Sequence, residues 1–231
     1  GTWASQCDTV ESAFKTLKNH IEMMSVSVVV NGVVGDNTSR SLDVDEFRGF
    51  VLADTTAPVI FINGRDTKSA QIFTLIHELC HLAYAQTGVS NAPDDEYPSA
   101  DIELFCNTVA AEFLVPGALL KSEWISDSQD DFQKIKKTAA ARKVNFIVVA
   151  RKARDMGLVS QEDFFRLYNQ YKSDMPLTKK RSGKGGNYLF SKQYRLGNVF
   201  SDAVRTAVGT NYLDYRDAYD LTGMKAPTFK K

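Results

Sequence analysis

The sequence has no apolar run approaching the roughly 20 residues that a membrane-spanning helix needs. Its longest apolar stretch, residues 26–34, is interrupted by Ser27, Asn31 and Gly32. The N-terminus also lacks the basic and apolar regions of a secretory signal. These absences predict a protein without a membrane segment. Because the chain starts at Gly1 rather than Met, we expect a processed chain or a fragment from which an upstream domain could be missing.

Cysteine is scarce, with three in the chain: Cys7, Cys80 and Cys106. An odd, small number provides no disulfide framework, and free thiols are typical of a reducing compartment. We therefore expect a cytoplasmic protein. A thiolate near a metal can bind it or sense oxidation. The ordinary role of such a side chain is apolar packing, and we expect packing for Cys80 and Cys106.

A net charge is absent too, since 28 basic residues balance 28 acidic ones. This balance argues against a chain dominated by nucleic-acid binding. The charge is uneven, however, because residues 176–231 hold 11 Lys and Arg against 4 Asp and Glu, whereas residues 1–175 hold 17 against 24. A solvated basic tail, or one docked on the acidic body, is the simpler interpretation. Contact with an acidic partner or nucleic acid is the alternative.

Apolar periodicity predicts a mixed α+β part followed by a helical part. Apolar residues at helical spacing predict helices at about 9–24, 67–86, 99–114, 128–140, 145–156 and 159–171. Runs rich in β-branched and aromatic residues predict strands at about 25–30, 47–52 and 58–62.

The chain end reads differently from the rest. A polar Gly/Lys/Ser linker covers residues 173–187, and we expect a short strand pair and two short helices in residues 188–231. The expected organisation has three regions: a first domain at 1–125, a helical region at 126–175 in which two helices could form a helix-turn-helix-like pair, and a basic appendage at 176–231.

The run H-E-L-C-H at residues 77–81 predicts a metal site. Residues four apart project from one face of a helix, so His77 and His81 can both reach one Zn²⁺ ion. Glu78 would then lie beside the open coordination position, where it can act as a general base. The chain has three His in total, and two of them fall in this motif. A pair of core histidines bonded to backbone acceptors is the simpler alternative.

A catalytic zinc site needs a third protein ligand. His20 has no motif around it, so a carboxylate is favoured. Glu103 lies in the next predicted helix, and Asn107, four residues later on the same face, can orient a ligand histidine. The weaker rivals are Glu112 and the acidic loop residues Asp94, Asp95 and Glu96. Tyr84 and Tyr97 are candidate oxyanion donors, although packing is the usual role of such tyrosines.

Three runs together resemble the ImmA/IrrE family of metallo-endopeptidases: P-V-I-F-I-N at 58–63, F-T-L-I-H-E-L-C-H-L at 73–82 and E-L-F-C-N-T-V-A-A-E-F-L-V-P at 103–116. Members typically show a strand ending in Asn, then F-T-x-x-H-E-x-x-H, then E-x-x-A-N-x-F-A-A-x-x-L-x-P. Cys106 and Val109 replace the usual Ala and Phe. The C-terminal half looks like the extension of some members.

The resemblance implies a zincin-like fold, with a small twisted, mostly antiparallel sheet packed on the active-site helix and a mainly helical C-terminal half. It implies His77, His81 and Glu103 as ligands of one Zn²⁺ and Glu78 as the catalytic base. It also implies the substrate, a helix-turn-helix repressor or antitoxin-type partner, and control of a stress, phage or mobile-element operon.

Two other interpretations stay open. One is a zincin-shaped regulator that recognises a partner or DNA without cleaving it, although such a protein need not keep Glu78. The other is nucleic-acid binding through residues 128–171 and the basic end of the chain, which Asp155, Glu162 and Asp163 weaken.

Overall fold

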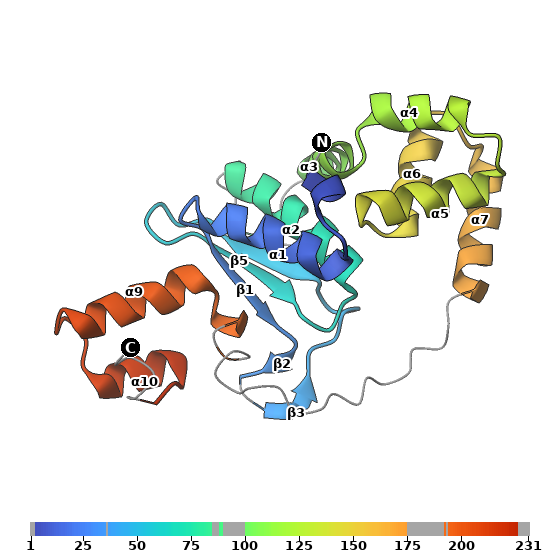
Figure 1. Cartoon of the computed structure of the whole chain (residues 1–231). Helices are drawn as coiled ribbons and strands as arrows, with labels where there is room; N and C mark the ends of the chain where they lie inside the picture. The colour runs from blue at the N-terminus through green and yellow to red at the C-terminus, as the bar shows by residue number, and fades with distance from the viewer. Residues whose placement is uncertain are drawn as a thin grey trace. The chain divides into compact units, whose positions relative to one another are not determined.

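The computed structural model describes residues 3–35, 37–84, 88–89, 100–174, 192 and 194–225. The chain divides into two compact units, each assembled from segments far apart in the sequence. The first comprises residues 1–17, 67–80 and 98–182, and the second comprises residues 18–66, 81–97 and 183–231. Figure 1 colours the chain along its length and labels the elements of both units.

The second unit is built on a four-stranded mixed sheet in the order β1-β5-β4-β6. Strand β1, at one edge, pairs parallel with β5, and β4 pairs antiparallel with both β5 and β6. Alternate residues on β1 and β5 are buried, as the pleat requires. The bounds are β1 Ser27–Asn31, β4 Gly49–Leu52, β5 Val59–Asn63 and β6 Gly88–Val89.

A two-stranded antiparallel hairpin, absent from the sequence prediction, follows β1. Its strands are β2, Val33–Val34, and β3, Asn37–Ser41. The residues of β3 are all exposed, so burial produces no alternating hydrophobic pattern that would reveal it.

The end of the second unit is a helical pair, α9 (Asn198–Gly209) and α10 (Tyr215–Thr222). They share a small core of Val204, Val208 and Ala218. Helix α9 lies beside β1 (Figure 1). The two expected short helices are therefore confirmed, and residues 194–225 contain no strand pair.

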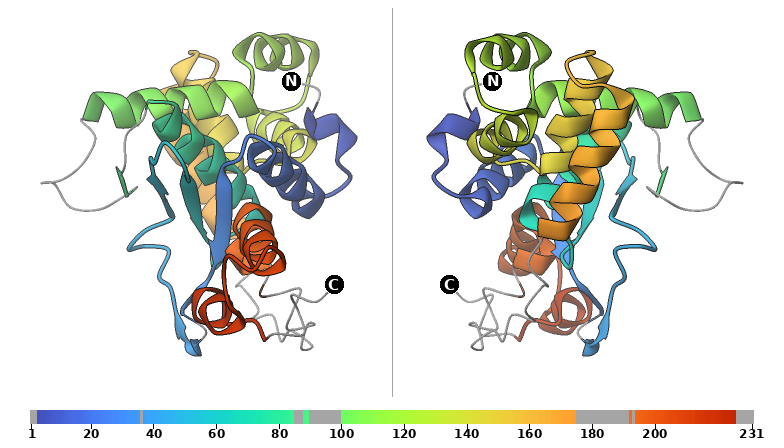
Figure 2. Two further views of the ribbon diagram at one scale, coloured as in Figure 1. Left: turned by 90° about the vertical axis from the view of Figure 1, so that its left-hand side faces the viewer. Right: turned by 90° about the vertical axis from the view of Figure 1, so that its right-hand side faces the viewer.

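The first unit is helical (Figure 2). Helix α6 is its centre, because it packs against α3, α5 and α7. Its Phe146, Val149, Ala150 and Ala153 are buried. The bounds are η1 Trp3–Gln6, α3 Ala100–Leu114, α4 Gly117–Ser126, α5 Asp131–Arg142, α6 Phe146–Asp155 and α7 Gln161–Asp174. Two more helices run from one unit into the other: α1 Val10–Glu22 and α2 Lys68–Ala83.

The predicted helices and strands are present with small shifts at their ends, and the α+β class is confirmed. Helix α4 was not predicted. Pro116 and Gly117 suggest a helix end, but Pro116 occupies the N-cap position of α4, where its missing N–H costs nothing. Within the described residues no single helix has both the length and the apolar content to cross a membrane; α3 and α4 together meet that test, with a bend of 53° between them.

Candidate metal centre

Helix α2 carries the H-E-x-x-H run close to its C-terminal end. The helix starts after Thr67, whose carbonyl oxygen accepts a hydrogen bond from the Gln71 N–H at 2.9 Å. A helix that carries apolar side chains on most of its faces is buried on most of them. His77 and His81 are accordingly 5% and 2% exposed, and Glu78 is fully buried.

Helix α3 brings Glu103 to the imidazoles from its first turn. The Glu103 Oε2 atom lies 3.3 Å from the Nε2 atom of His77. His77, His81 and Glu103 each offer one ligand atom, and these three atoms all lie within 4.8 Å of one another. Two ligands of a tetrahedral zinc ion, each bound at about 2.0–2.2 Å, lie about 3.4 Å from one another. The His77–Glu103 separation is therefore that of two ligands of one ion.

The donor set fits a divalent metal in its chemistry as well. Two imidazole nitrogens and one carboxylate oxygen form the His₂Glu set of a catalytic zinc site. The imidazoles are enclosed, whereas 34% of the Glu103 side chain is exposed. A site closed on the histidine side and open beside the carboxylate leaves room for water and substrate.

Phe73 supports the site, although the sequence interpretation gave it no role. Its ring stacks on His77, with centroids 6.2 Å apart and planes at 26°. The two residues are four apart on α2, and side chains at that spacing are neighbours on a helix. The spacing alone could have predicted this contact, which restricts rotation of the imidazole.

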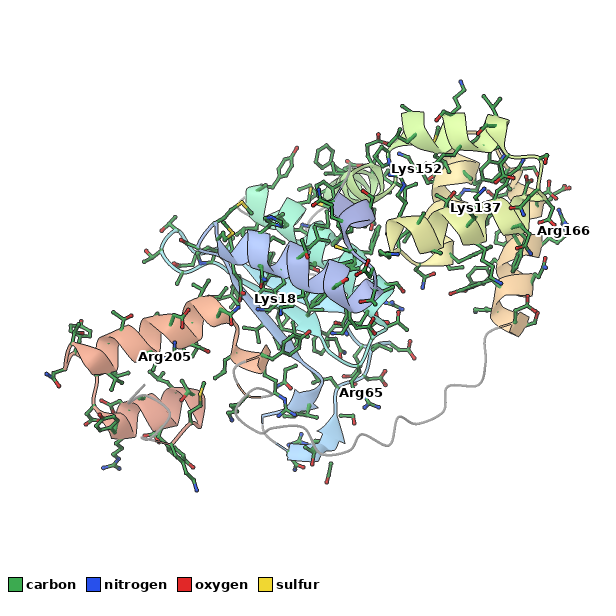
Figure 3. All side chains as sticks on the ribbon, viewed as in Figure 1. Lys18, Arg65, Lys137, Lys152, Arg166 and Arg205 are labelled. Atoms are coloured by element: carbon green, nitrogen blue, oxygen red, sulfur yellow. The ribbon has the colours of Figure 1, made fainter. Side chains whose placement is uncertain are left out.

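The rival carboxylate Glu112 has a structural role instead. It accepts hydrogen bonds from Lys152 on α6 and from the Gly117 N–H at the start of α4. Lys152 is labelled in Figure 3. These two bonds lower the pKa of Glu112, the bond from Lys152 contributing most. His20, the remaining histidine, is exposed on α1. Asp94, Asp95 and Glu96 lie outside the described residues.

The other predicted site residues are either exposed or outside the described residues. Asn107 is exposed on α3, one turn beyond Glu103, and its role in orienting a ligand stays a prediction. Tyr84 follows the end of α2 and is 52% exposed. Tyr97 lies outside the described residues.

The two cysteines of the motifs, Cys80 on α2 and Cys106 on α3, are both free and buried. Burial, followed by Cys80 and by the negative charges of Glu103 and Glu78, raises the pKa of Cys106 to about 12. Both cysteines are thus part of the buried core, as the expected packing role requires.

The arrangement of two histidines and a glutamate on consecutive helices can now be compared with known families. The IrrE N-terminal-like domain family (Peptidase_M78) matches residues 36–154, which is 119 of the 231 residues. The chain belongs to this family. The resemblance stated from the motifs is confirmed, and the chain is a metallopeptidase-family protein with a candidate metal site.

The family match has a consequence for the organisation of the chain. It continues across position 125 and includes α5 and most of α6, so these helices belong to the IrrE-like domain sequence. Residues 196–231, which contain α9 and α10, match a domain of unknown function (DUF8813). The boundaries expected at 125/126 and 175/176 stay predictions. A comparison with curated proteins gives no match.

Proposed function

We propose that the chain is a zinc-dependent endopeptidase that cleaves a helix-turn-helix transcriptional repressor or an antitoxin-type partner. Such cleavage would regulate a stress, phage or mobile-element operon. The observation that carries the peptidase proposal is the convergence of His77, His81 and Glu103, with the 3.3 Å separation of the His77 and Glu103 ligand atoms. Zinc is proposed because two imidazoles and one carboxylate are donors that it prefers.

The site residues divide the chemical work. His77, His81 and Glu103 would hold the ion, which when bound supplies Lewis acidity for the peptide carbonyl and for water. Glu78 is the adjacent carboxylate on α2 and is fully buried. It would take a proton from the attacking water and deliver it to the leaving amine, the work of a general acid–base group.

The substrate proposal rests on the family. ImmA/IrrE-like peptidases act on helix-turn-helix regulators, and the match across residues 36–154 supports an equivalent target for this chain. A repressor encoded beside the gene is the first candidate. The side chains of the described site do not by themselves indicate which repressor is cleaved. The target is therefore to be identified by experiment.

Incubation of the zinc-loaded chain with the neighbouring repressor, with and without a chelator, tests the proposal. Wild type should cleave the repressor, and the chelator should stop cleavage. Glu78→Gln should lose about 10²–10⁴-fold in rate while keeping one zinc per chain, because only the proton transfer is removed. Glu162→Gln, an exposed carboxylate on α7, serves as the matched control and should cleave normally. Equal rates for wild type and Glu78→Gln would sink the mechanism.

The alternative function is a regulator that binds its partner without cleaving it. The intact Glu78 beside the ligand histidines favours cleavage. Stable binding of the repressor by the zinc-loaded wild type, with no product after prolonged incubation, would select the alternative.

DNA recognition through α5 and α6 finds less support. The two helices are joined by residues 143–145, as in a helix-turn-helix. A recognition helix needs a polar face free to enter the major groove. Helix α6 instead packs against α3, α5 and α7. DNA binding by the basic end of the chain is a separate proposal, and a salt-dependent gel shift that is lost on removal of residues 175–231 would support it.

A further inference from the structure

Helices α4 and α5 line a cavity of about 390 Å³ beside the loop that joins them. Small-molecule sites in proteins usually measure about 300–1,000 Å³. Trp124, close to the end of α4, forms one wall, and Lys134, Thr138 and Ala141 form another, at helical spacing on α5. Both helices belong to the same compact unit, and the cavity shares no residue with the metal centre.

The two carboxylates in the wall of the cavity already have cationic partners. Asp127 accepts a hydrogen bond from Lys137 at 2.7 Å and another from the Gln129 N–H at 3.0 Å. Glu123 accepts one from Arg142 at 2.6 Å. A cationic ligand would have to displace one of these two side chains, so the lining does not favour a cation.

Two sheltered donors in the cavity lack an acceptor. The Lys134 side chain is 15% exposed, and its Nζ atom lies 3.8 Å from an Asp131 oxygen, beyond hydrogen-bond distance. The same atom lies 5.2 Å from the centre of the Trp124 ring. Thr138 is 7% exposed. Within the described part of the chain, neither the Lys134 ammonium nor the Thr138 hydroxyl has a hydrogen-bond partner, which is unusual for groups so well enclosed.

Other sheltered lysines provide an internal comparison. Lys18 donates to Glu22 at 2.6 Å, Lys68 donates to Gln71 at 2.8 Å, and Lys152 donates to Glu112. Each of these ammonium groups has an oxygen acceptor from the chain itself. Lys134 differs from them because it is held over an aromatic ring and points its donors into a cavity.

We propose that this cavity binds a small organic anion, a carboxylate attached to a planar ring. The carboxylate oxygens would accept hydrogen bonds from the Lys134 ammonium and the Thr138 hydroxyl, which lie one helical turn apart on α5. The ring would pack against the indole of Trp124. One ammonium without an acceptor matches a single negative charge, whereas a phosphate dianion would also need Lys137, which Asp127 holds.

Titration of the full chain with para-fluorobenzoate, followed by fluorine NMR of the ligand, tests the proposal. Binding should saturate with a dissociation constant on the order of 1 mM, as expected of so small a ligand. The uncharged analogue para-fluorobenzamide has the same ring and nearly the same shape. It should bind at least about tenfold more weakly, because hydrogen bonds to a charged group are the stronger ones.

Variants on α5 locate the site. Lys134→Met keeps the apolar stem and should weaken binding of the benzoate by about 10–100-fold, the effect of losing a charged donor. Thr138→Val keeps the shape and should weaken it by about 2–10-fold. Ala141→Phe should fill the cavity and block both ligands. Lys136→Met is the matched control, because Lys136 is an exposed lysine of α5 outside the cavity, and it should bind as wild type does.

Several results would overturn the site. They are the absence of saturable binding, equal affinities for the benzoate and the benzamide, and equal losses in Lys134→Met and Lys136→Met, which would mark a general effect of surface charge. Thermal melts of each variant show whether it is folded, and Thr138→Val with Ala141→Phe keeps the test decisive if Lys134→Met is not. No readout uses zinc or cleavage, so failure of the repressor assay leaves this proposal unaffected.

Discussion

Asn63 shows how one buried amide at a strand end holds a loop in place. It is the last residue of β5 and is 0% exposed. Its Nδ2 atom donates to the carbonyl oxygens of Asp43 and Phe47 at 3.1 Å each, and its Oδ1 atom accepts from the Arg65 N–H at 3.0 Å. This amide therefore joins the loop before β4 to the turn after β5.

Replacing Asn63 should leave these part-buried backbone groups without their side-chain partner. We expect Asn63→Ala to lower the free energy of unfolding by about 1–3 kcal/mol, the cost of hydrogen-bonding groups that lose their partners. Asn37→Ala is the matched control, because Asn37 is exposed and bonds only locally to the Ser39 N–H. Denaturant unfolding of the two variants measures the difference, and equal stabilities would contradict the role assigned to Asn63.

At the scale of elements, the position of α9 beside β1 depends on a buried carboxylate. Glu22 at the end of α1 accepts hydrogen bonds at 2.8 Å from the backbone N–H and the side-chain amide of Asn198. Lys18, also buried, neutralises it at 2.6 Å. A negative charge at the first turn of α9 is favourable for the helix dipole. Gly197 lies beside this contact.

Gly197 precedes α9 and Gly209 is its last residue. Replacing each by alanine should change the stability of α9 in opposite directions. Gly197 has a φ of +81°, and a Cβ there would lie 2.8 Å from the Val28 carbonyl oxygen, so Gly197→Ala should loosen α9 from β1. Gly209, the last residue of α9, has open space around it, so Gly209→Ala should stabilise the helix by up to about 1 kcal/mol. Hydrogen exchange of α9 amides should rise in the first variant and fall in the second.

The contact of α3 with α4 and α6 should weaken in acid. The folded-state pKa of Glu112 is lowered from 4.5, so the folded protein favours the ionised form and the unfolded chain binds a proton more readily. Its stabilising contribution is therefore complete well above 4.5 and is lost as the pH falls below that value. Glu112→Gln should be less stable than wild type at pH 7, and the difference should shrink at about pH 3. Thermal melts at both pH values test this, and a pH-independent difference would contradict it.

At the scale of the whole molecule, a metal that binds only the folded chain must stabilise it. Zinc at a hundred times its dissociation constant adds about 2.7 kcal/mol, which for a chain of this size corresponds to roughly 5–10 °C in melting temperature. A chelator should remove that increment from wild type. His81→Ala should show little of it, since one of the three ligands is missing. A melting temperature unaffected by zinc would argue against a metal at this site.

The helical pitch and the strand patterns were determined by the sequence alone. His77 and His81 are four residues apart in a run with apolar residues on most faces, so a helix placing both on one side was predictable from local geometry. The same holds for β1 and β5, whose β-branched residues suit a pleated sheet. Helix α4 and the β2–β3 hairpin were not predictable in this way. Helix α4 follows directly on Pro116, a residue that usually marks a helix end. The residues of β3 are all exposed, so the hairpin has no hydrophobic pattern there.

Only the tertiary structure decided which side chains from different helices meet. Glu103 and Glu112 are both carboxylates on α3, but Glu103 faces His77, while Glu112 bonds to Lys152. Similarly, nothing in the sequence predicts that Glu22 and Asn198, 176 residues apart, are hydrogen bonded. The physical reason is the same in both cases. Periodicity fixes the faces of one helix, whereas the partner of each face depends on how the helices pack.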